Sequence, residues 1–269
     1  MEELDNKKEV EIQKIGDYFD QIGNIWIYPY NKEKGAWYEY YPICFREKHA
    51  FEMIDKEKRG VAVDLGCGYG HALIEMKRLG FRNVIGVDIS DKMLHSVQEL
   101  LIRHGLANEI KLYKADVQNL SMIESGSIDV CLALGVIEYQ SSDRPLLIEI
   151  NRILKPGGIA IVQIRNYDCI YDKTSRATTK ILQRIQFQKI FFRRHKTKEF
   201  ISEAEKYGFK VVQVAYSHFY ALYPFTLIPL FRKLLWPFDN YLSKKMERFS
   251  GIRMGRWLAS MCISKIQKI

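Results

Sequence analysis

VAVDLGCGYG, residues 61–70, is a short apolar run followed by three closely spaced glycines. The apolar run predicts a buried strand, and the glycines predict a tight turn that opens a helix. Glycine suits such a turn because a ligand can approach its backbone more closely than a Cβ permits, and because the turn can require a positive φ. A tight turn without a ligand would look similar, so the flanking residues are needed to interpret the loop.

Short apolar runs alternate with longer amphipathic stretches beyond this loop, which is typical of βα units on a parallel sheet. We expect strands at residues 61–65, 83–88, 110–114, 128–134, 159–164, 210–216 and 262–267. We expect helices at residues 71–79, 91–104, 144–154 and 197–207, the second of them capped by Ser90. Pro156-Gly157-Gly158 should end a helix and turn the chain into the fifth strand. The predicted fold is α/β, a Rossmann-like seven-stranded mostly parallel sheet flanked by helices.

Two parts of the chain depart from this alternation. Residues 1–59 mix charged and aromatic side chains, and helical spacing from 36 to 54 predicts an N-terminal helical lead-in or lid. After the fifth strand, residues 166–196 break the pattern, and an excursion of that length usually carries function. We therefore expect a main domain at residues 60–269 with a cap inserted after the fifth strand, in which residues 166–196 and 217–255 are the cap elements.

Composition limits the class of protein. A chain of 269 residues that is 47% hydrophobic and 27% charged can bury a sizeable core. No apolar stretch reaches 18 residues and the N-terminus is polar, so we expect a cytoplasmic protein that is neither secreted nor membrane-spanning. Five cysteines, an odd number without a CxxC pair, suit a reducing cytosol and argue against a structural zinc site.

The positive charge, +9 overall, belongs to the second half of the chain. Residues 170–200 hold nine lysines and arginines against two acids, which would fit an anionic or phosphate-bearing partner or a solvated basic helix face. Residues 219–238 are aromatic and basic. They could lie at a membrane interface, cover an apolar substrate or form a homodimer contact.

Two acids flank the glycine turn. Asp88 ends the next apolar strand, 24 residues after Asp64, near the offset at which Rossmann-type sites hold ribose hydroxyls. A helix-capping or solvated acid is the alternative for Asp88. Asp64 directly precedes the glycines, where a carboxylate disfavours a pyrophosphate. S-adenosylmethionine (SAM) presents an ammonium and a sulfonium and no phosphate, so Asp64 favours SAM over a dinucleotide.

The chain resembles the class I SAM-dependent methyltransferases over roughly residues 60–165, particularly the small-molecule branch called methyltransferase type 11. The resemblance rests on five motifs in the expected order: VAVDLGCGYG (61–70), VIGVDIS (84–90), KADVQNL (114–120), IDVCLALGVIEY (128–139) and ILKPGG (153–158). It implies SAM as the cofactor and S-adenosylhomocysteine as the product.

The resemblance also implies which residues surround SAM. It places Asp64, Gly66 and Gly68 at the methionine part, Asp88 at the ribose, Ile89, Asp116 and Val117 at the adenine, and Leu134 and Gly135 near the methionine end. Tyr18 and Trp37 are lid candidates, because the lead-in of related enzymes often folds over the cofactor. Family members often carry a histidine where this chain has Tyr139, so a histidine-based step at that position is in doubt.

Methyl transfer from a sulfonium needs mainly alignment and exclusion of water, although an oxygen acceptor usually needs a general base. The candidate bases are His195, Glu138 and His218. We expect transfer to oxygen or nitrogen of a small-molecule acceptor of sugar, lipid-linked or natural-product type, either anionic or amphiphilic. An RNA or protein methyltransferase and a non-catalytic SAM-binding partner subunit remain alternatives. A nucleic-acid substrate is disfavoured because residues 134–137 lack the Asn/Asp-Pro-Pro-aromatic signature of amine-methylating nucleic-acid enzymes.

Overall fold

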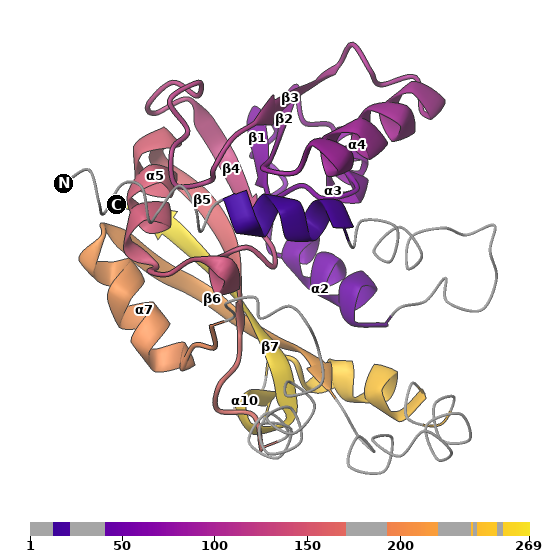
Figure 1. Ribbon diagram of the computed structural model, residues 1–269. Coiled ribbons are helices and arrows are strands. Elements are labelled where there is room, and N and C mark those ends of the chain that lie inside the picture. The colour runs from indigo at the N-terminus through magenta and orange to yellow at the C-terminus, as the bar shows by residue number, and fades with distance from the viewer. Residues whose placement is uncertain (1–12, 22–40, 171–192, 220–237, 239–240, 252–254) are drawn as a thin grey trace.

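The computed structural model describes residues 13–21, 41–170, 193–219, 238, 241–251 and 255–269 (Figure 1). Seven strands form one sheet in the order β3-β2-β1-β4-β5-β7-β6. The strands are β1 (Val61–Leu65), β2 (Asn83–Asp88), β3 (Ile110–Lys114), β4 (Ile128–Ala133), β5 (Leu154–Arg165), β6 (Phe209–Phe219) and β7 (Ala259–Lys268). The first five are parallel, and β7 lies antiparallel between β5 and β6. The predicted Rossmann-like, mostly parallel sheet is confirmed.

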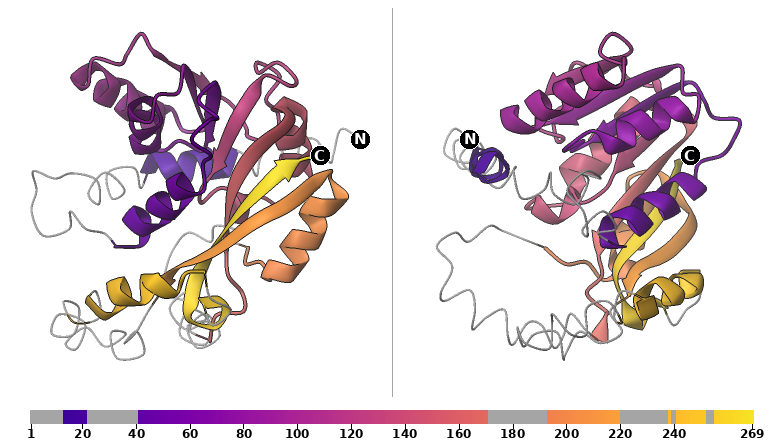
Figure 2. Two further views of the ribbon diagram at one scale, coloured as in Figure 1. Left: turned by 180° about the vertical axis from the view of Figure 1, so that it is seen from behind. Right: turned by 90° about the vertical axis from the view of Figure 1, so that its right-hand side faces the viewer.

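Helices cover both faces of this sheet (Figures 1 and 2). One core layer joins the sheet to α2 (Tyr41–Glu52), α3 (His71–Arg78) and α4 (Asp91–Arg103). The opposite layer joins it to α5 (Arg144–Ile153) and α7 (Thr197–Lys206). The remaining described helices are residues 13–21, the 3₁₀ turns η3 (Ile137–Tyr139) and η4 (Glu247–Phe249), the helical residues 241–246, and α10 (Gly255–Leu258). None of the described helices is long and apolar enough to cross a membrane.

The fifth strand begins earlier than the sequence predicts. Leu154 pairs with Ile128 and Ile159 pairs with Val130, so the segment between them bulges out of a strand that continues on both sides. Gly157 has φ 71° within the bulge. A Cβ on Gly158 would lie 2.8 Å from the Lys155 carbonyl oxygen, so the backbone requires glycine there. The expectation that Pro156 ends a helix and that the glycines lead into the strand is wrong, because α5 ends at Ile153 and these three residues lie inside β5.

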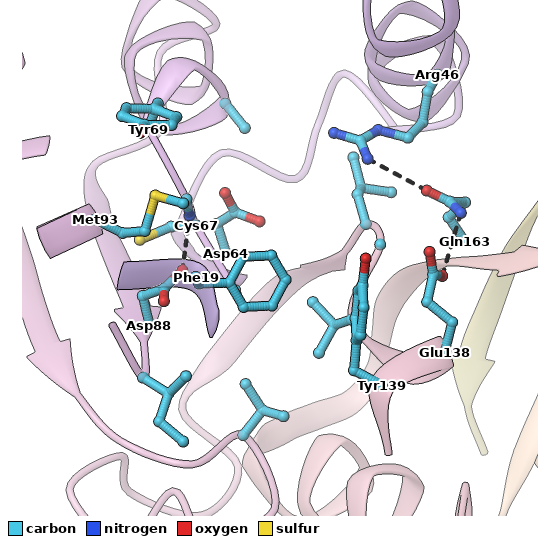
Figure 3. A pocket seen from close by; sticks show the side chains of 18 of the residues that line it. Phe19, Arg46, Asp64, Cys67, Tyr69, Asp88, Met93, Glu138, Tyr139 and Gln163 are labelled. Carbon is cyan, nitrogen blue, oxygen red and sulfur yellow. Dashed lines mark hydrogen bonds between the residues drawn. The ribbon is translucent and has the colours of Figure 1, made fainter. Parts of the chain in front are cut away.

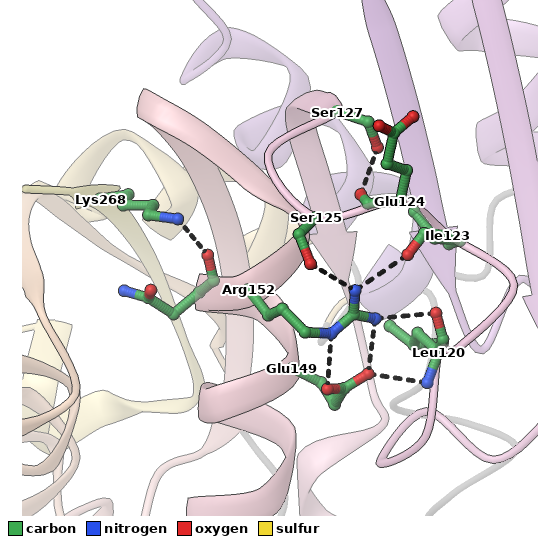
Figure 4. A network of polar contacts seen from close by, with 9 residues as sticks. Leu120, Ile123, Glu124, Ser125, Ser127, Glu149, Arg152 and Lys268 are labelled. Carbon is green, nitrogen blue, oxygen red and sulfur yellow. Dashed lines mark hydrogen bonds and ion pairs between the residues drawn. The ribbon is translucent and has the colours of Figure 1, made fainter.

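Two half-buried side chains of α5, Arg152 and Glu149, fix the loop that follows β3 (Figure 4). The Arg152 guanidinium donates to both carboxylate oxygens of Glu149, at 2.9 Å each, and to the carbonyl oxygens of Leu120 (2.8 Å) and Ile123 (2.9 Å). It also donates to the Ser125 hydroxyl at 3.0 Å. Glu149 in turn accepts the Leu120 backbone N–H at 2.8 Å. Because this loop begins at the carboxyl end of β3, the network helps to hold one wall of the candidate site.

Candidate active site

A cavity of about 320 Å³ lies at the carboxyl ends of the parallel strands. The chain crosses from β1 into α3 on one face and from β4 into α5 on the other, so β1 and β4 form the topological switch point of the sheet. Ligands of open α/β sheets bind at this point. The predicted residues that line the cavity are Asp64, Gly66, Gly68, Asp88, Ile89, Asp116, Val117, Leu134, Gly135, Glu138 and His218.

The glycine loop leaves its backbone open toward the cavity. Gly66, Gly68 and Gly70 all have positive φ, which L-residues rarely adopt. A Cβ on Gly66 would lie 2.5 Å from the Val136 side chain, so packing requires glycine there. A Cβ on Gly68 would meet nothing within 4 Å and would occupy open space instead. The loop therefore provides the close backbone approach that a bound ligand needs.

Asp88 ties this loop to the end of β2. Its Oδ2 accepts the Gly68 N–H at 2.8 Å, and its Oδ1 accepts the Ser90 N–H at 2.9 Å. Burial raises the pKa of Asp88, and these backbone hydrogen bonds oppose the rise. A carboxylate has further lone pairs beyond the two used here, so it can also accept from the vicinal hydroxyls of a ribose. The hydroxyl of Ser90 accepts the Met93 N–H at 3.0 Å, which confirms the predicted cap of α4.

Asp64 lines the cavity and is only 4% exposed. Burial, together with the negative charges of Glu47 and Asp88, raises its pKa from 3.8 to about 8, although Arg46 opposes the shift. A positively charged ligand group would favour the ionised carboxylate. The electrostatics therefore suit an ammonium and a sulfonium and disfavour a phosphate.

Arg46 and Glu47, on α2, are site residues that the sequence analysis missed. A Cβ on Gly135 would lie 3.0 Å from Arg46 Nη1, which places the guanidinium at the predicted methionine end. The same Nη1 is 3.4 Å from the Gln163 side-chain oxygen. Both charged residues belong to the predicted lead-in helix, but no spacing in the sequence relates them to the glycine loop. A guanidinium here can bind the carboxylate of an amino acid.

The helix of residues 13–21 lies against the cavity, and Ile15 and Phe19 of this helix line it. The Phe19 ring packs edge-on against Tyr139, with centroids 5.2 Å apart. Asp20 contacts the Ser90 hydroxyl at the other side. The predicted lid residue Tyr18 is half-buried against Phe19, outside the lining, and Trp37 lies outside the described residues.

The predicted adenine end includes residues of the loop that follows β3. Val117 is 6% exposed and belongs to the hydrophobic core, and both Val117 and Ile89 line the cavity. The Asp116 Oδ1 accepts the Gln118 N–H at 3.0 Å. Asp116 thus caps its own loop and also lines the cavity, and its contact with an adenine amino group stays a prediction.

The other half of the cavity is lined by residues of β5, β6 and β7. In the sheet, Arg165 of β5 pairs with Met261 of β7, and Met261 pairs with Ser217 of β6. His218, the next residue of β6, therefore lies at the same end of these three strands as Arg165 and Met261. In Figure 3, Asp64 and Asp88 lie on one side of the Phe19 ring, and Glu138 and Gln163 lie on the other side. The cavity therefore has an acidic nucleotide-type half and a mixed-charge half.

The three candidate bases have different surroundings. Burial raises the pKa of Glu138, although Arg165, Arg46 and His195 oppose the shift, and its Oε2 is 3.4 Å from the Gln163 amide nitrogen. His218 lines the cavity and is 6% exposed. His195 lies outside the lining, because its Nε2 contacts Asp143 Oδ1 at 2.9 Å. Arg193 donates to the same oxygen, so Asp143 pairs with both His195 and Arg193.

Known proteins resemble this chain in sequence and in fold. Residues 63–162 match the family model described as a methyltransferase domain. The chain is 28% identical over 169 residues to a sterol 4-C-methyltransferase of Caenorhabditis elegans, covering 61% of this chain and 49% of that protein. It is 34% identical over 131 residues to a ubiquinone biosynthesis O-methyltransferase of Caulobacter vibrioides, covering 46% of this chain and 51% of that protein. The matches thus span about half the length of these relatives.

A solved structure with the same fold covers nearly the whole chain. Magnesium protoporphyrin IX methyltransferase from Synechocystis PCC 6803, with bound S-adenosylhomocysteine, has a TM-score of 0.66. The similarity covers 96% of this chain and 100% of that protein, at 14% sequence identity. At this identity the likeness shows the fold alone.

Proposed function

We propose that this chain, which carries a class I SAM-dependent methyltransferase domain at residues 63–162, transfers a methyl group from SAM to a small-molecule acceptor. The acceptor atom is an oxygen or a nitrogen. The observation that carries the proposal is the acidic half of the cavity, where the carboxyl groups of Asp64, Asp88 and Glu47 lie beside an open glycine backbone and a cationic ligand would ionise Asp64. This environment fits a ligand with positive charge, a ribose and no phosphate.

The residues of this half would hold SAM at both ends. Asp64 would balance the ammonium and the sulfonium, and Arg46 would bind the carboxylate of the methionine part. Asp88 would accept from the ribose hydroxyls, with Ile89 and Val117 against the adenine. SAM supplies an electrophilic methyl group on a sulfonium that leaves as a neutral thioether.

The chain's own residues would align the acceptor and exclude water. Phe19 and Tyr139 pack together in the lining of the cavity, and its other half offers Glu138, Arg165 and His218 to an acceptor. Arg165 in the lining favours an acceptor with an anionic group. The sterol and quinone substrates named for the relatives support a small-molecule acceptor.

Calorimetry with SAM and S-adenosylhomocysteine tests the binding. We expect both to bind the wild type and Asp88→Ala to lose most of the affinity, because two vicinal hydroxyls lose their acceptor. Asp91→Ala is the matched control, since Asp91 is an exposed acid paired with Lys114. No heat with either ligand would contradict the proposal.

Transfer itself is tested with methyl-labelled SAM and fractionated cell extract. We expect label in the small-molecule fraction. Label in RNA or protein instead would support a macromolecular methyltransferase, and binding without any transfer would support a non-catalytic SAM-binding subunit. Either result would overturn the proposed acceptor class.

We also infer that this protein binds anionic membrane surfaces, which would suit an amphiphilic acceptor. Exposed aromatic side chains near the C-terminal end each have a cation over the ring: Tyr241 with Lys245 at 4.6 Å, Phe249 with Arg248 at 5.3 Å and Trp257 with Arg256 at 5.4 Å. Arg256 is paired with Asp168, so Lys245 and Arg248 are the cations offered to a membrane, and apolar rings beside cations fit a headgroup region. We expect co-sedimentation with vesicles containing phosphatidylglycerol and weaker co-sedimentation after Trp257→Ala. Failure to bind such vesicles would contradict this inference.

A further inference from the structure

His218 has an unusual backbone at the far end of the cavity. It lies in β6, yet its φ is 64°, and within the described part of the chain no other non-glycine residue has a positive φ. L-residues other than glycine persist in this conformation only where the surroundings hold them, and such residues cluster at functional sites.

The Glu247 carboxylate holds this backbone from η4. Its Oε1 accepts the His218 N–H at 2.9 Å and the Ser217 hydroxyl at 3.2 Å. Its Oε2 contacts His49 Nε2 on α2 at 2.8 Å. Glu247 is only 4% exposed, so these contacts satisfy a carboxylate that would otherwise be costly to bury. One side chain thus joins α2, η4 and the end of β6.

The His218 ring is oriented by Ser260 of β7. The Ser260 hydroxyl is 2.8 Å from His218 Nδ1 and 3.3 Å from the His218 carbonyl oxygen. This hydroxyl has a single proton. When it donates to the carbonyl oxygen, Nδ1 carries a proton that it donates to Ser260 Oγ, and Nε2 becomes the proton-accepting nitrogen.

Burial, together with a nearby cation, keeps the His218 ring neutral. Burial lowers the pKa of His218 well below its ordinary value, and the nearby cation of Arg165 lowers it further. The ionisable groups that face it come from each neighbouring element: Arg165 on β5, Glu247 on η4 and, through Glu247, His49 on α2. A neutral imidazole is the form that can accept a proton.

We propose that His218 is the general base for the methyl acceptor and that Glu247 is the positioning residue that fixes it. This inference rests on the proposed methyl transfer. In the step, the bond between sulfur and methyl breaks and a bond between methyl and the acceptor oxygen or nitrogen forms. The sulfur keeps the electron pair of the broken bond, and the acceptor proton passes to Nε2 of His218.

Four variants test the two roles. We expect His218→Gln to lower kcat for label transfer at least a hundredfold, in the range that general bases contribute. Glu247→Leu should lower kcat at least tenfold with the KM for SAM unchanged, because the backbone of residue 218 is released. Glu247→Gln should keep most of the activity, since its amide oxygen can still accept from the His218 N–H and the Ser217 hydroxyl. Glu203→Gln, at a half-buried acid on α7 that pairs with Lys206, is the matched control.

The assay uses methyl-labelled SAM and the extract fraction that the wild type methylates, with SAM affinity measured separately by calorimetry. Wild-type kcat should fall at low pH as the ring protonates, and this fall should be missing in His218→Gln. If Glu247→Leu does not fold, His218→Gly takes its place, because glycine adopts positive φ without strain; it should bind SAM and transfer as slowly as His218→Gln.

The result that would overturn the inference is transfer by His218→Gln within threefold of the wild type, or a Glu247→Leu effect confined to the KM for SAM. A wild type that neither binds SAM nor transfers label would instead count against the proposed function. The two failures are therefore distinguishable.

Discussion

Replacement of Asp64 by asparagine should stabilise the ligand-free protein and weaken SAM binding. Burial and the charges of Glu47 and Asp88 raise the pKa of Asp64 from 3.8 to about 8, so the folded chain retains a proton that the unfolded chain releases. A group with a raised pKa stabilises the fold fully below the unfolded pKa and loses that contribution as pH rises toward the folded pKa. Asparagine carries no such penalty.

The magnitude follows from the pH interval. For each pH unit between about 4 and 7, the free energy of unfolding of the wild type falls by about 1.4 kcal/mol relative to a protein with a neutral side chain at position 64. The largest stability difference at pH 7 is therefore roughly 4 kcal/mol. Between pH 5 and pH 7 the free energy of unfolding of Asp64→Asn, relative to the wild type, should rise by about 3 kcal/mol. All other groups titrate alike in both proteins and cancel in the difference.

Urea denaturation at pH 5, 6 and 7 measures this difference. Asp129→Asn is the control, because the pKa of Asp129 lies below its ordinary value. Burial raises this pKa, but hydrogen bonds from Lys155 and from the Val61 N–H outweigh the effect of burial. Asp129 is therefore ionised in both states at these pH values, and its variant should be destabilised by a constant amount. A stability difference for Asp64→Asn that does not change with pH would refute the reasoning.

Ligand binding provides the second half of this prediction. A cationic ligand favours the ionised carboxylate, so SAM binding should release a proton, and the affinity of the wild type should rise by up to tenfold per pH unit from pH 6 to 7.5. The interval ends there because the α-ammonium of SAM itself titrates near pH 8. Calorimetry in buffers of different ionisation enthalpy counts the released proton. Asp64→Asn should bind more weakly and without proton release; equal pH dependence in both proteins would exclude Asp64 as the titrating group.

Three further predictions concern other parts of the structure. Arg46→Met should weaken SAM binding at least tenfold, about 1.4 kcal/mol, and Arg46→Lys less so; calorimetry with equal affinities would contradict its role at the methionine carboxylate. Arg152→Leu should lower the free energy of unfolding by about 2–4 kcal/mol in urea, because Glu149 and two loop carbonyls lose their donor; a loss under about 0.5 kcal/mol would show the network to be dispensable. Gly66→Ala should destabilise the protein more than Gly68→Ala by thermal unfolding, because only its Cβ meets Val136, and equal losses would contradict this packing argument.

The local part of the fold could be predicted from neighbouring residues. The bounds of β1, β2 and β3 agree with the expected ones, and Ser90 caps α4 as expected. Each of these features depends on apolar periodicity or on a side chain within a few residues of its partner. The bulge at the start of β5 was not predicted, because a strand that resumes beyond Pro156 and two glycines can be recognised only from its pairing with β4.

The candidate site also contains residues that the sequence identified and residues that only the tertiary structure revealed. Asp64, the glycine loop and Asp88 were identified from the sequence, because each lies directly at the end of an apolar strand and parallel strands bring such ends together. Only the tertiary structure brings Arg46 to Gly135, since the helix that carries Arg46 packs on the sheet through side chains with no fixed spacing from the loop.

The far half of the cavity depended wholly on the tertiary structure. His218 could be named from sequence as a candidate, but its level beside Arg165 follows from β7, the last strand of the chain, pairing between β5 and β6. Its positive φ and its contact with Glu247 depend on packing among η4, α2 and β6. Sequence patterns report local preference, whereas the convergence of distant side chains and a backbone held against its preference are determined by long-range packing.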